Sequence, residues 1–139
     1  MNPSDFPPDF PPELMGMVAP PDPMASAPRP LKVSEIFHSV QGEGRLMGVP
    51  SVFVRLSGCN LRCTWCDTPY SSWTPEGDEM MLGAIIGRLR RLWVRHVVVT
   101  GGEPMIFPEV KLLTERLKQD DMHITIETAG TVDQDVQCD

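Results

Sequence analysis

The sequence predicts an α/β fold that is built on a parallel β-sheet. Segments of strand composition alternate with segments of helical periodicity from residue 31 onward, and the segment 96–100 (HVVVT) is apolar on both faces. Strands that are separated by helices form right-handed βαβ crossovers, and a strand that is apolar on both faces is typical of a buried parallel sheet. The length of 139 residues suits a single domain.

Residues 1–30 lie outside this pattern. They hold ten of the fifteen prolines, and proline lacks an amide donor and breaks helices. We therefore expect a disordered, proline-rich tail over 1–30 and a folded region over 31–139. The tail has no basic start and no continuous apolar run, so it does not have the composition of a secretory signal.

The folded region opens with two predicted strands, 31–37 and 52–57, that are joined by a turn-rich loop. Alternate residues of the second strand are apolar, which indicates one buried face. A helix is predicted over 79–94, where six apolar residues recur at helical spacing and Asp78 is placed as the N-cap. These six residues are Leu82, Ile85, Ile86, Leu89, Leu92 and Trp93.

The second half of the folded region repeats the alternation. The buried strand 96–100 precedes a helix that opens at Pro108 and ends near Asp120. A strand over 123–128 follows it.

Three motifs come directly after predicted strands. They are the cysteine loop (59–66), the glycine turn (101–104, GGEP) and the threonine turn (127–131, ETAGT). In parallel sheets and barrels, ligands bind beyond the carboxyl ends of the strands. We therefore expect the three motifs to form one site.

Composition excludes some classes of partner. The net charge of −7, from 12 basic and 19 acidic residues, argues against nucleic acid. No apolar run has the length of a membrane span. Four cysteines without a secretory signal indicate a cytoplasmic protein whose thiols stay reduced.

The cysteine loop has the spacing C-x3-C-x2-C, from Cys59 through Cys63 to Cys66, and it allows three interpretations. Structural zinc needs a fourth ligand, which Cys138 or His38 would have to supply. A redox dithiol at Cys63 and Cys66 would leave Cys59 without a role. A 4Fe-4S cluster on three thiolates would leave one iron open to a small molecule.

Two of these motifs carry a family resemblance. The spaced cysteines with Trp65 before the last one, followed by the Gly101–Pro104 turn after a buried strand, resemble the radical S-adenosylmethionine superfamily. The flanking sequence over 37–44, 48–68 and 127–131 resembles the 7-carboxy-7-deazaguanine synthase family within it. The resemblance implies a partial parallel β/α barrel.

The activity that the resemblance implies is a lyase reaction in queuosine and deazapurine biosynthesis. The ring of 6-carboxytetrahydropterin is contracted to 7-carboxy-7-deazaguanine with loss of ammonia. The implied cofactors are a 4Fe-4S cluster, S-adenosylmethionine and Mg2+.

The resemblance also implies roles for individual residues, none of them catalytic. The cluster ligands are Cys59, Cys63 and Cys66, and Thr68 binds Mg2+. The contacts to S-adenosylmethionine are Trp65, Cys66, Asp67 and Gly102. The substrate contacts are Val40, Gln41, Gly42, Arg55 and Thr100. Glu103 is expected to offer its carboxylate or its backbone carbonyl to the methionine ammonium.

The implied partners are an electron donor such as a flavodoxin or ferredoxin and a second copy of the chain in a homodimer. Family members continue through further strands, so the sequence also predicts a chain truncated at its carboxyl end. Three alternatives stay open: an inactive fragment of the enzyme, an iron–sulfur electron carrier and a glycyl-radical activase. The carrier would need no substrate loop, whereas Gln41 and Arg55 match one.

Overall fold

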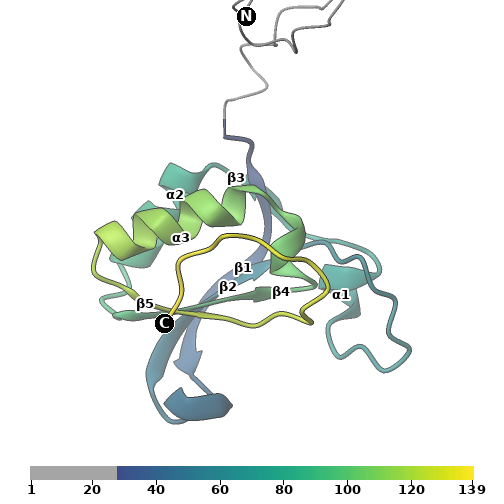
Figure 1. The fold of residues 1–139 in the computed structure, drawn as a ribbon, viewed down its shortest axis with the longest axis horizontal. Helices are drawn as coiled ribbons and strands as arrows, with labels where there is room; N and C mark the ends of the chain where they lie inside the picture. The colour runs from purple at the N-terminus through teal and green to yellow at the C-terminus, as the bar shows by residue number, and fades with distance from the viewer. Residues whose placement is uncertain (1–27) are drawn as a thin grey trace, which may run out of the picture.

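The structure, a computed structural model, describes residues 28–139 (Figure 1). The predicted proline-rich tail therefore lies outside the described residues except for 28–30, which are exposed and belong to no helix or strand. The division of the chain at residue 30 stays a prediction.

Five strands form one mixed sheet in the order β3-β1-β2-β4-β5. The strands are β1 (Leu31–Val40), β2 (Pro50–Leu56), β3 (Asp78–Met80), β4 (His96–Gly101) and β5 (His123–Ile126). The last two pairs, β2 with β4 and β4 with β5, are parallel. The predicted α/β class is confirmed.

The expectation of a wholly parallel sheet was wrong at β1. This strand runs antiparallel to both β2 and β3. Parallel strands need a crossover connection of about a dozen residues or more, and the loop over 41–49 is shorter than that. It contains only the 3-10 turn η3 (Gly44–Leu46), so the chain turns back along its own strand.

The helix predicted over 79–94 is shorter at both ends, because α2 spans Leu82–Arg90. Residues 78–80 form β3 instead, since their backbone pairs with the free edge of β1. Met81 is therefore the N-cap and not Asp78. At the other end Trp93 adopts a positive φ of 55° and is 93% exposed, so its predicted place on the buried helix face was wrong.

The remaining helices agree with the sequence pattern or were missed by it. The helix predicted from Pro108 is α3 (Glu109–Gln119), with Pro108 as its N-cap. The short helix α1 (Pro69–Ser72) and the 3-10 turn η4 (Pro104–Ile106) were not predicted. No helix among residues 28–139 combines the length and the apolar character that a membrane crossing needs.

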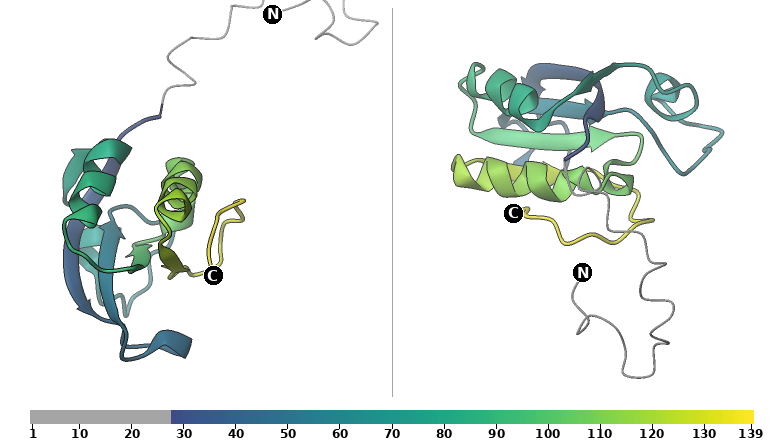
Figure 2. Two further views of the ribbon diagram at one scale, coloured as in Figure 1. Left: turned by 90° about the vertical axis from the view of Figure 1, so that its left-hand side faces the viewer. Right: turned by 90° about the horizontal axis from the view of Figure 1, so that it is seen from above.

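Helices α2 and α3 cover one face of the sheet, as the views in Figure 2 show. The core between the layers consists of fully buried aliphatic side chains, each contributing about 1.5–3 kcal/mol of burial free energy. Its members include Val52, Val54, Leu56, Ile85, Leu89, Val97, Val99, Leu113 and Ile124. The parallel strands β2 and β4 are therefore fixed relative to one another by apolar packing as well as by their hydrogen bonds.

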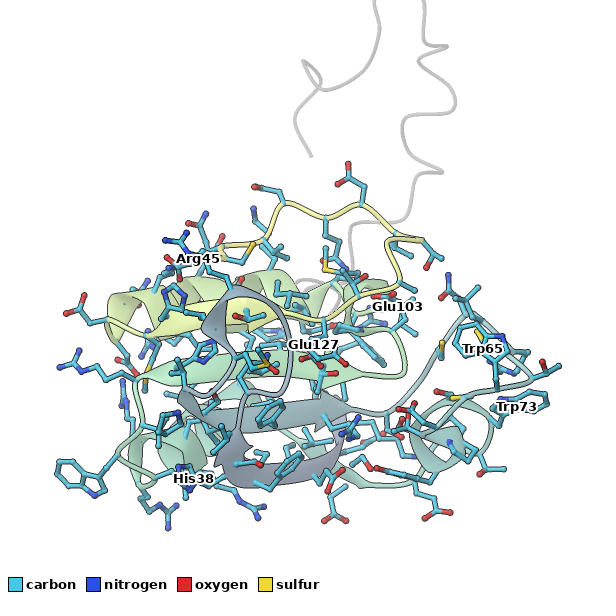
Figure 3. The ribbon with its side chains drawn as sticks, turned by 90° about the horizontal axis from the view of Figure 1, so that it is seen from below. His38, Arg45, Trp65, Trp73, Glu103 and Glu127 are labelled. Atoms are coloured by element: carbon cyan, nitrogen blue, oxygen red, sulfur yellow. The ribbon has the colours of Figure 1, made fainter. Side chains whose placement is uncertain are left out.

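The other face, called the inner face below, carries no helix. Phe37 and Phe53 stack on it with ring centroids 5.1 Å apart. The loop over 41–49 lies on this side, as the view onto this face in Figure 3 shows. Residues 132–139 return beside α3 and β5, where the Asp139 N–H donates to the Ile124 carbonyl (3.0 Å).

Candidate cofactor and substrate site

The cysteine loop, the glycine turn and the threonine turn meet beyond the carboxyl ends of β2, β4 and β5. The Gly102 N–H donates to the Leu56 carbonyl (3.2 Å), and the Glu103 N–H donates to the carbonyl of Gly58, just before the cysteine loop (2.9 Å). The side chains of Asn60 and Thr131 bond to each other at 3.0 and 3.2 Å, which joins the cysteine loop to the threonine turn. The predicted meeting of the three turns is confirmed.

Glycine is needed at the turn after β4 because its backbone touches the cysteine loop. A Cβ at residue 102 would lie 2.3 Å from the Gly58 carbonyl oxygen and 2.8 Å from the Cys59 Cβ. A Cβ at residue 101, where φ is +150°, would lie 2.1 Å from the Leu56 carbonyl oxygen. The cysteine loop and the end of β2 thus pack directly on a wall of bare backbone, and their own atoms fill the space that a side chain would take.

The three cysteines of the loop are free thiols and half-buried. The Leu61 N–H donates to Cys59 Sγ (3.3 Å). The hydrogen bond between Cys66 Sγ and the Ser72 hydroxyl (3.5 Å) lowers the pKa of this thiol, and a hydrogen bond to the Thr68 backbone adds to the effect. A lowered pKa favours the thiolate, which is the form that binds metals.

Neither candidate for a fourth zinc ligand lies near the cysteine loop. His38 pairs with Val52 in the strand register, which places it about 13 Å along β2 from Leu56, the last residue of that strand. Cys138 precedes Asp139, whose backbone is bonded to Ile124 near the start of β5. Both residues therefore belong to the opposite end of the sheet, which argues against structural zinc.

Glu103 does not have the role that the sequence suggested for its carboxylate. Its side chain is fully buried, and its oxygens accept from the N–H groups of Met105 (2.9 Å) and Ala129 (2.8 Å). The Thr128 hydroxyl donates to both oxygens at 2.8 and 2.9 Å. The expectation that this carboxylate is free for a methionine ammonium was wrong, because the protein's own donors occupy it.

Arg55 lies on the inner face and is held by an acidic side chain. Its Nε donates to Glu35 Oε1 (2.7 Å), and the Tyr70 hydroxyl donates to the same oxygen (3.1 Å). The guanidinium lies 5.9 Å from the centre of the Phe37 ring. Partial burial raises the pKa of Tyr70, and the Glu35 hydrogen bond acts in the same direction. The Arg55 Nη groups have no hydrogen-bond partner among residues 28–139, so they are free to bind an anion.

Thr100 is the partner of Arg55 in the parallel register between β2 and β4. It is buried at 5% exposure, and the glycine turn begins at the next residue. The structure therefore places two of the predicted substrate contacts side by side and next to the glycine turn.

The predicted substrate residues of the loop after β1 begin farther away. Val40 pairs with Pro50, at the end of β2 that is remote from the cysteine loop, and it is 55% exposed. Gly42 is also exposed. Gln41, however, is buried, and its Nε2 donates to Glu127 Oε1 (3.2 Å), so it reaches the start of the threonine turn.

A family model described as the Radical SAM superfamily matches residues 53–138. The chain belongs to this superfamily. The matched region contains the cysteine loop and both turns, and membership implies a 4Fe-4S cluster and S-adenosylmethionine as cofactors.

Similarity to curated relatives indicates a smaller group of proteins within this superfamily. The chain is 51% identical over 109 residues to a 7-carboxy-7-deazaguanine synthase of Rhodopirellula baltica, which covers 78% of this chain and 42% of the relative. It is 46% identical over 110 residues to one of Halobacterium salinarum, covering 78% and 43%. The chain thus spans less than half the length of either relative.

A solved structure gives the same result at the level of the fold. The crystal structure of QueE from Escherichia coli aligns with a TM-score of 0.67 and 31% identity, over 77% of this chain and 55% of that one. This likeness supports the predicted partial barrel of the radical SAM type.

The residues of this radical SAM chain fit the implied cluster in two respects. Three thiols within eight residues supply the ligands, and hydrogen bonding lowers the pKa of the Cys66 thiol, which favours the thiolate that binds metals. Among the described residues, no three His, Cys, Asp or Glu side chains are gathered into a metal site.

The other predicted cofactor contacts lie on the outer side of this loop. Trp65 is 83% exposed and projects away from the sheet (Figure 3), and Asp67 is also exposed. The Thr68 hydroxyl lies 3.9 Å from Cys66 Sγ. Trp65 and Asp67 therefore lie next to the thiols at the surface, whereas the Thr68 carbonyl accepts from the Ser71 N–H and hydroxyl, both at 3.0 Å.

Sequence reasoning missed four residues that support the site. Glu35, Tyr70, Ser72 and Thr128 hold Arg55, Cys66 and Glu103 in place. Glu35 and Arg55 occupy opposed positions of neighbouring antiparallel strands. Their pairing would follow from the strand register, which the sequence did not supply.

Proposed function

We propose that the chain is the cofactor-binding part of a 7-carboxy-7-deazaguanine synthase. The reaction contracts 6-carboxytetrahydropterin to 7-carboxy-7-deazaguanine with loss of ammonia. The observation that supports it most is the pair Arg55 and Thr100, which lies on the inner face directly beside the glycine turn. The name of the relatives that are 51% and 46% identical supports the same substrate.

Cys59, Cys63 and Cys66 would hold the cluster, and S-adenosylmethionine would bind beside these thiolates. When bound, the cluster supplies the electron that cleaves S-adenosylmethionine. The backbone at Gly102 would lie against the cofactor, and Trp65 and Asp67 would contact its adenosine part. The task of these residues is to orient the cofactor and to keep water from the reacting atoms.

The substrate carboxylate would bind the Nη groups of Arg55 in a fork, because Nε is already used by Glu35. Gln41 both donates and accepts, which suits the edge of a pterin ring. Val40 and Gly42 would contribute backbone contacts from the same loop, and Thr100 a hydroxyl from β4. Thr68 would bind Mg2+ together with water and substrate oxygens, since this ion takes few protein ligands.

The partners belong to the same proposal. A small electron-transfer protein such as a flavodoxin or ferredoxin would reduce the cluster, two copies of the synthase would associate, and the reaction would take place in the cytoplasm. Nucleic acid is not an expected partner, because the chain carries a net charge of −7.

Anaerobic reconstitution with iron and sulfide tests the proposal, followed by addition of S-adenosylmethionine, Mg2+ and 6-carboxytetrahydropterin. The expected results are a changed iron spectrum with S-adenosylmethionine and release of 7-carboxy-7-deazaguanine, measured by mass spectrometry. For a chain of this length, substrate binding is measured as well. R55A should weaken the binding of 6-carboxytetrahydropterin about tenfold or more, the effect of one lost charged hydrogen-bonding partner.

Three results would contradict the proposal. Zinc instead of iron in anaerobic protein would exclude the cofactor. An iron centre that does not respond to S-adenosylmethionine would indicate an electron carrier. Unchanged substrate affinity in R55A would exclude the assigned substrate contact.

A further inference from the structure

Glu103 is the only fully buried acidic side chain among the described residues, and it lies in the middle of the site. Its carboxylate accepts from two backbone N–H groups, of Met105 and Ala129, and from the Thr128 hydroxyl. An ionised carboxylate only accepts hydrogen bonds and has about four lone-pair positions. Three internal donors at 2.8–2.9 Å, one of them shared by both oxygens, occupy most of these positions.

We infer that Glu103 is a positioning residue that locks the glycine turn to the threonine turn, and that its carboxylate binds no ligand. The lock has two parts. The Glu103 N–H donates to the Gly58 carbonyl, which ties it to the cysteine loop. The side chain crosses to Thr128 and Ala129, which ties it to the end of β5.

Thr128 extends this lock by one further bond. Its hydroxyl hydrogen is donated to Glu103, and its oxygen accepts from the Gly130 N–H (2.9 Å). A single hydroxyl therefore fixes the direction of the threonine turn relative to the carboxylate. The position of Gly102, which adjoins Glu103 and faces Cys59, depends on the same group of bonds.

The chemistry of the partners predicts how substitutions act. In E103Q the new amide NH2 faces a backbone N–H, of either Met105 or Ala129, so two donors oppose each other in a buried place. T128V removes the hydroxyl without changing the shape of the side chain, which leaves Glu103 its two backbone bonds. T128S keeps the hydroxyl and should behave as the wild-type chain.

Amide hydrogen exchange on the cluster-free chain tests the lock. In T128V and E103Q, exchange at Ala129 and Gly130 should be faster by at least about tenfold, because opening of the threonine turn then breaks fewer hydrogen bonds to the carboxylate and to the Thr128 hydroxyl. T125V is the matched control, since it removes a β5 hydroxyl that bonds to His96, the first residue of β4 (2.8 Å), and not to Glu103. It should leave these two amides unchanged, and T128S should restore their protection. Unchanged exchange in T128V would overturn the inference. T128V alone decides the test if E103Q does not fold.

A second measurement separates positioning from direct binding of the ammonium group. It uses reconstituted protein and rests on superfamily membership, not on the proposed substrate. The ratio of affinities is measured for S-adenosylmethionine and for its analogue with a keto group in place of the amino group. A positioning role predicts that T128V and E103Q keep the ratio of the wild-type chain. A ratio that falls to about one in E103Q alone would overturn the inference, because the carboxylate would then be the ammonium ligand.

Discussion

The two ends of the parallel sheet use buried polar groups in opposite ways. At the amino end, His96 is buried between two hydroxyls, with Ser51 Oγ 2.7 Å from Nδ1 and Thr125 Oγ1 2.8 Å from Nε2. The Ser51 hydroxyl donates to the Val49 carbonyl (2.8 Å), so it accepts from Nδ1–H and Nε2 accepts from Thr125. The group is neutral, closed and fully paired.

At the carboxyl end, the buried polar group is the charged carboxylate of Glu103, and all its partners belong to turns. The groups that it supports are half-buried thiols and backbone, without a closed network of their own. One end of the sheet thus stabilises strands, whereas the other holds three turns in register and leaves the reactive groups open. Substitutions at the two ends should therefore change different measured quantities.

The largest expected effect is the loss of one thiol from the cysteine loop. In C63A, iron bound after anaerobic reconstitution should fall to background, because the superfamily's cluster needs all three thiolates. The urea midpoint of the cluster-free chain should not move, since Cys63 is half-buried and lies outside the core. Iron content and absorbance measure the effect. C138A is the control and should bind iron normally; equal iron in C63A would contradict the assignment.

A smaller effect is expected from filling the backbone wall. G102A would place a Cβ 2.3 Å from the Gly58 carbonyl oxygen, and overpacking of this kind costs about 1–3 kcal/mol. Unfolding in urea and titration with S-adenosylmethionine should both show the loss. G83A is the matched control, because its Cβ would meet nothing within 4 Å and alanine is favoured over glycine in a helix by about 0.5–1 kcal/mol. If G102A binds the cofactor as tightly as G83A, the wall is not part of the site.

At the opposite end, His96 should make stability depend on pH without affecting cofactor binding. Burial lowers the pKa of His96, and His123 at its side lowers it further, while Asp139 has the opposite, smaller effect. The unfolded chain therefore takes up the proton first as pH falls below about 6.5, so the folded state loses stability below that value.

H96Q tests this pH dependence. The drop in the free energy of unfolding between about pH 7.5 and about pH 5.5, on either side of the ordinary pKa of histidine, should be smaller in H96Q than in the wild-type chain. Urea unfolding at both pH values gives the comparison. An equal drop in the two proteins would mean that His96 is not protonated on unfolding in this range.

The smallest effect is expected at the outer contact of the site. T131V removes the exposed bond to Asn60, and surface substitutions of this kind change stability by no more than about 0.5 kcal/mol. Thermal unfolding should be nearly unchanged, whereas T128V, three residues earlier on the same turn, should change it more. A larger loss of stability in T131V than in T128V would mean that the contact between Thr131 and Asn60, and not Glu103, holds the turns together.

The sequence predicted where the three motifs meet better than it predicted the sheet. The cysteine loop and the glycine turn follow strands whose apolar composition is unmistakable, so their meeting at one edge follows from the rules for parallel sheets. The direction of β1 and the existence of β3 depend on pairing between segments far apart in the chain. Asp78 looked like a helix cap because its pairing with Val33 cannot be seen in the local pattern.

Within the site, one of the two expectations for Glu103 failed, namely a carboxylate that is free for the cofactor. A carboxylate beside two glycines suggests a ligand, and only the fold shows that Thr128 and Ala129 already occupy it. Ser72 and Tyr70 were missed for the same reason, since their partners Cys66 and Glu35 are defined by the path of the chain.

Trp65 stands between two of the thiols with its indole in solvent, whereas Trp93 projects into solvent next to the start of β4. Iron–sulfur clusters absorb broadly across the wavelengths at which indole emits. In a Trp73→Phe background, energy transfer to the cluster should quench the fluorescence of Trp65 when the cysteine loop binds the cluster. The fluorescence of Trp93 should stay unchanged. The fluorescence of Trp65 would therefore report how much cluster is bound, and the fluorescence of Trp93 would serve as an internal standard.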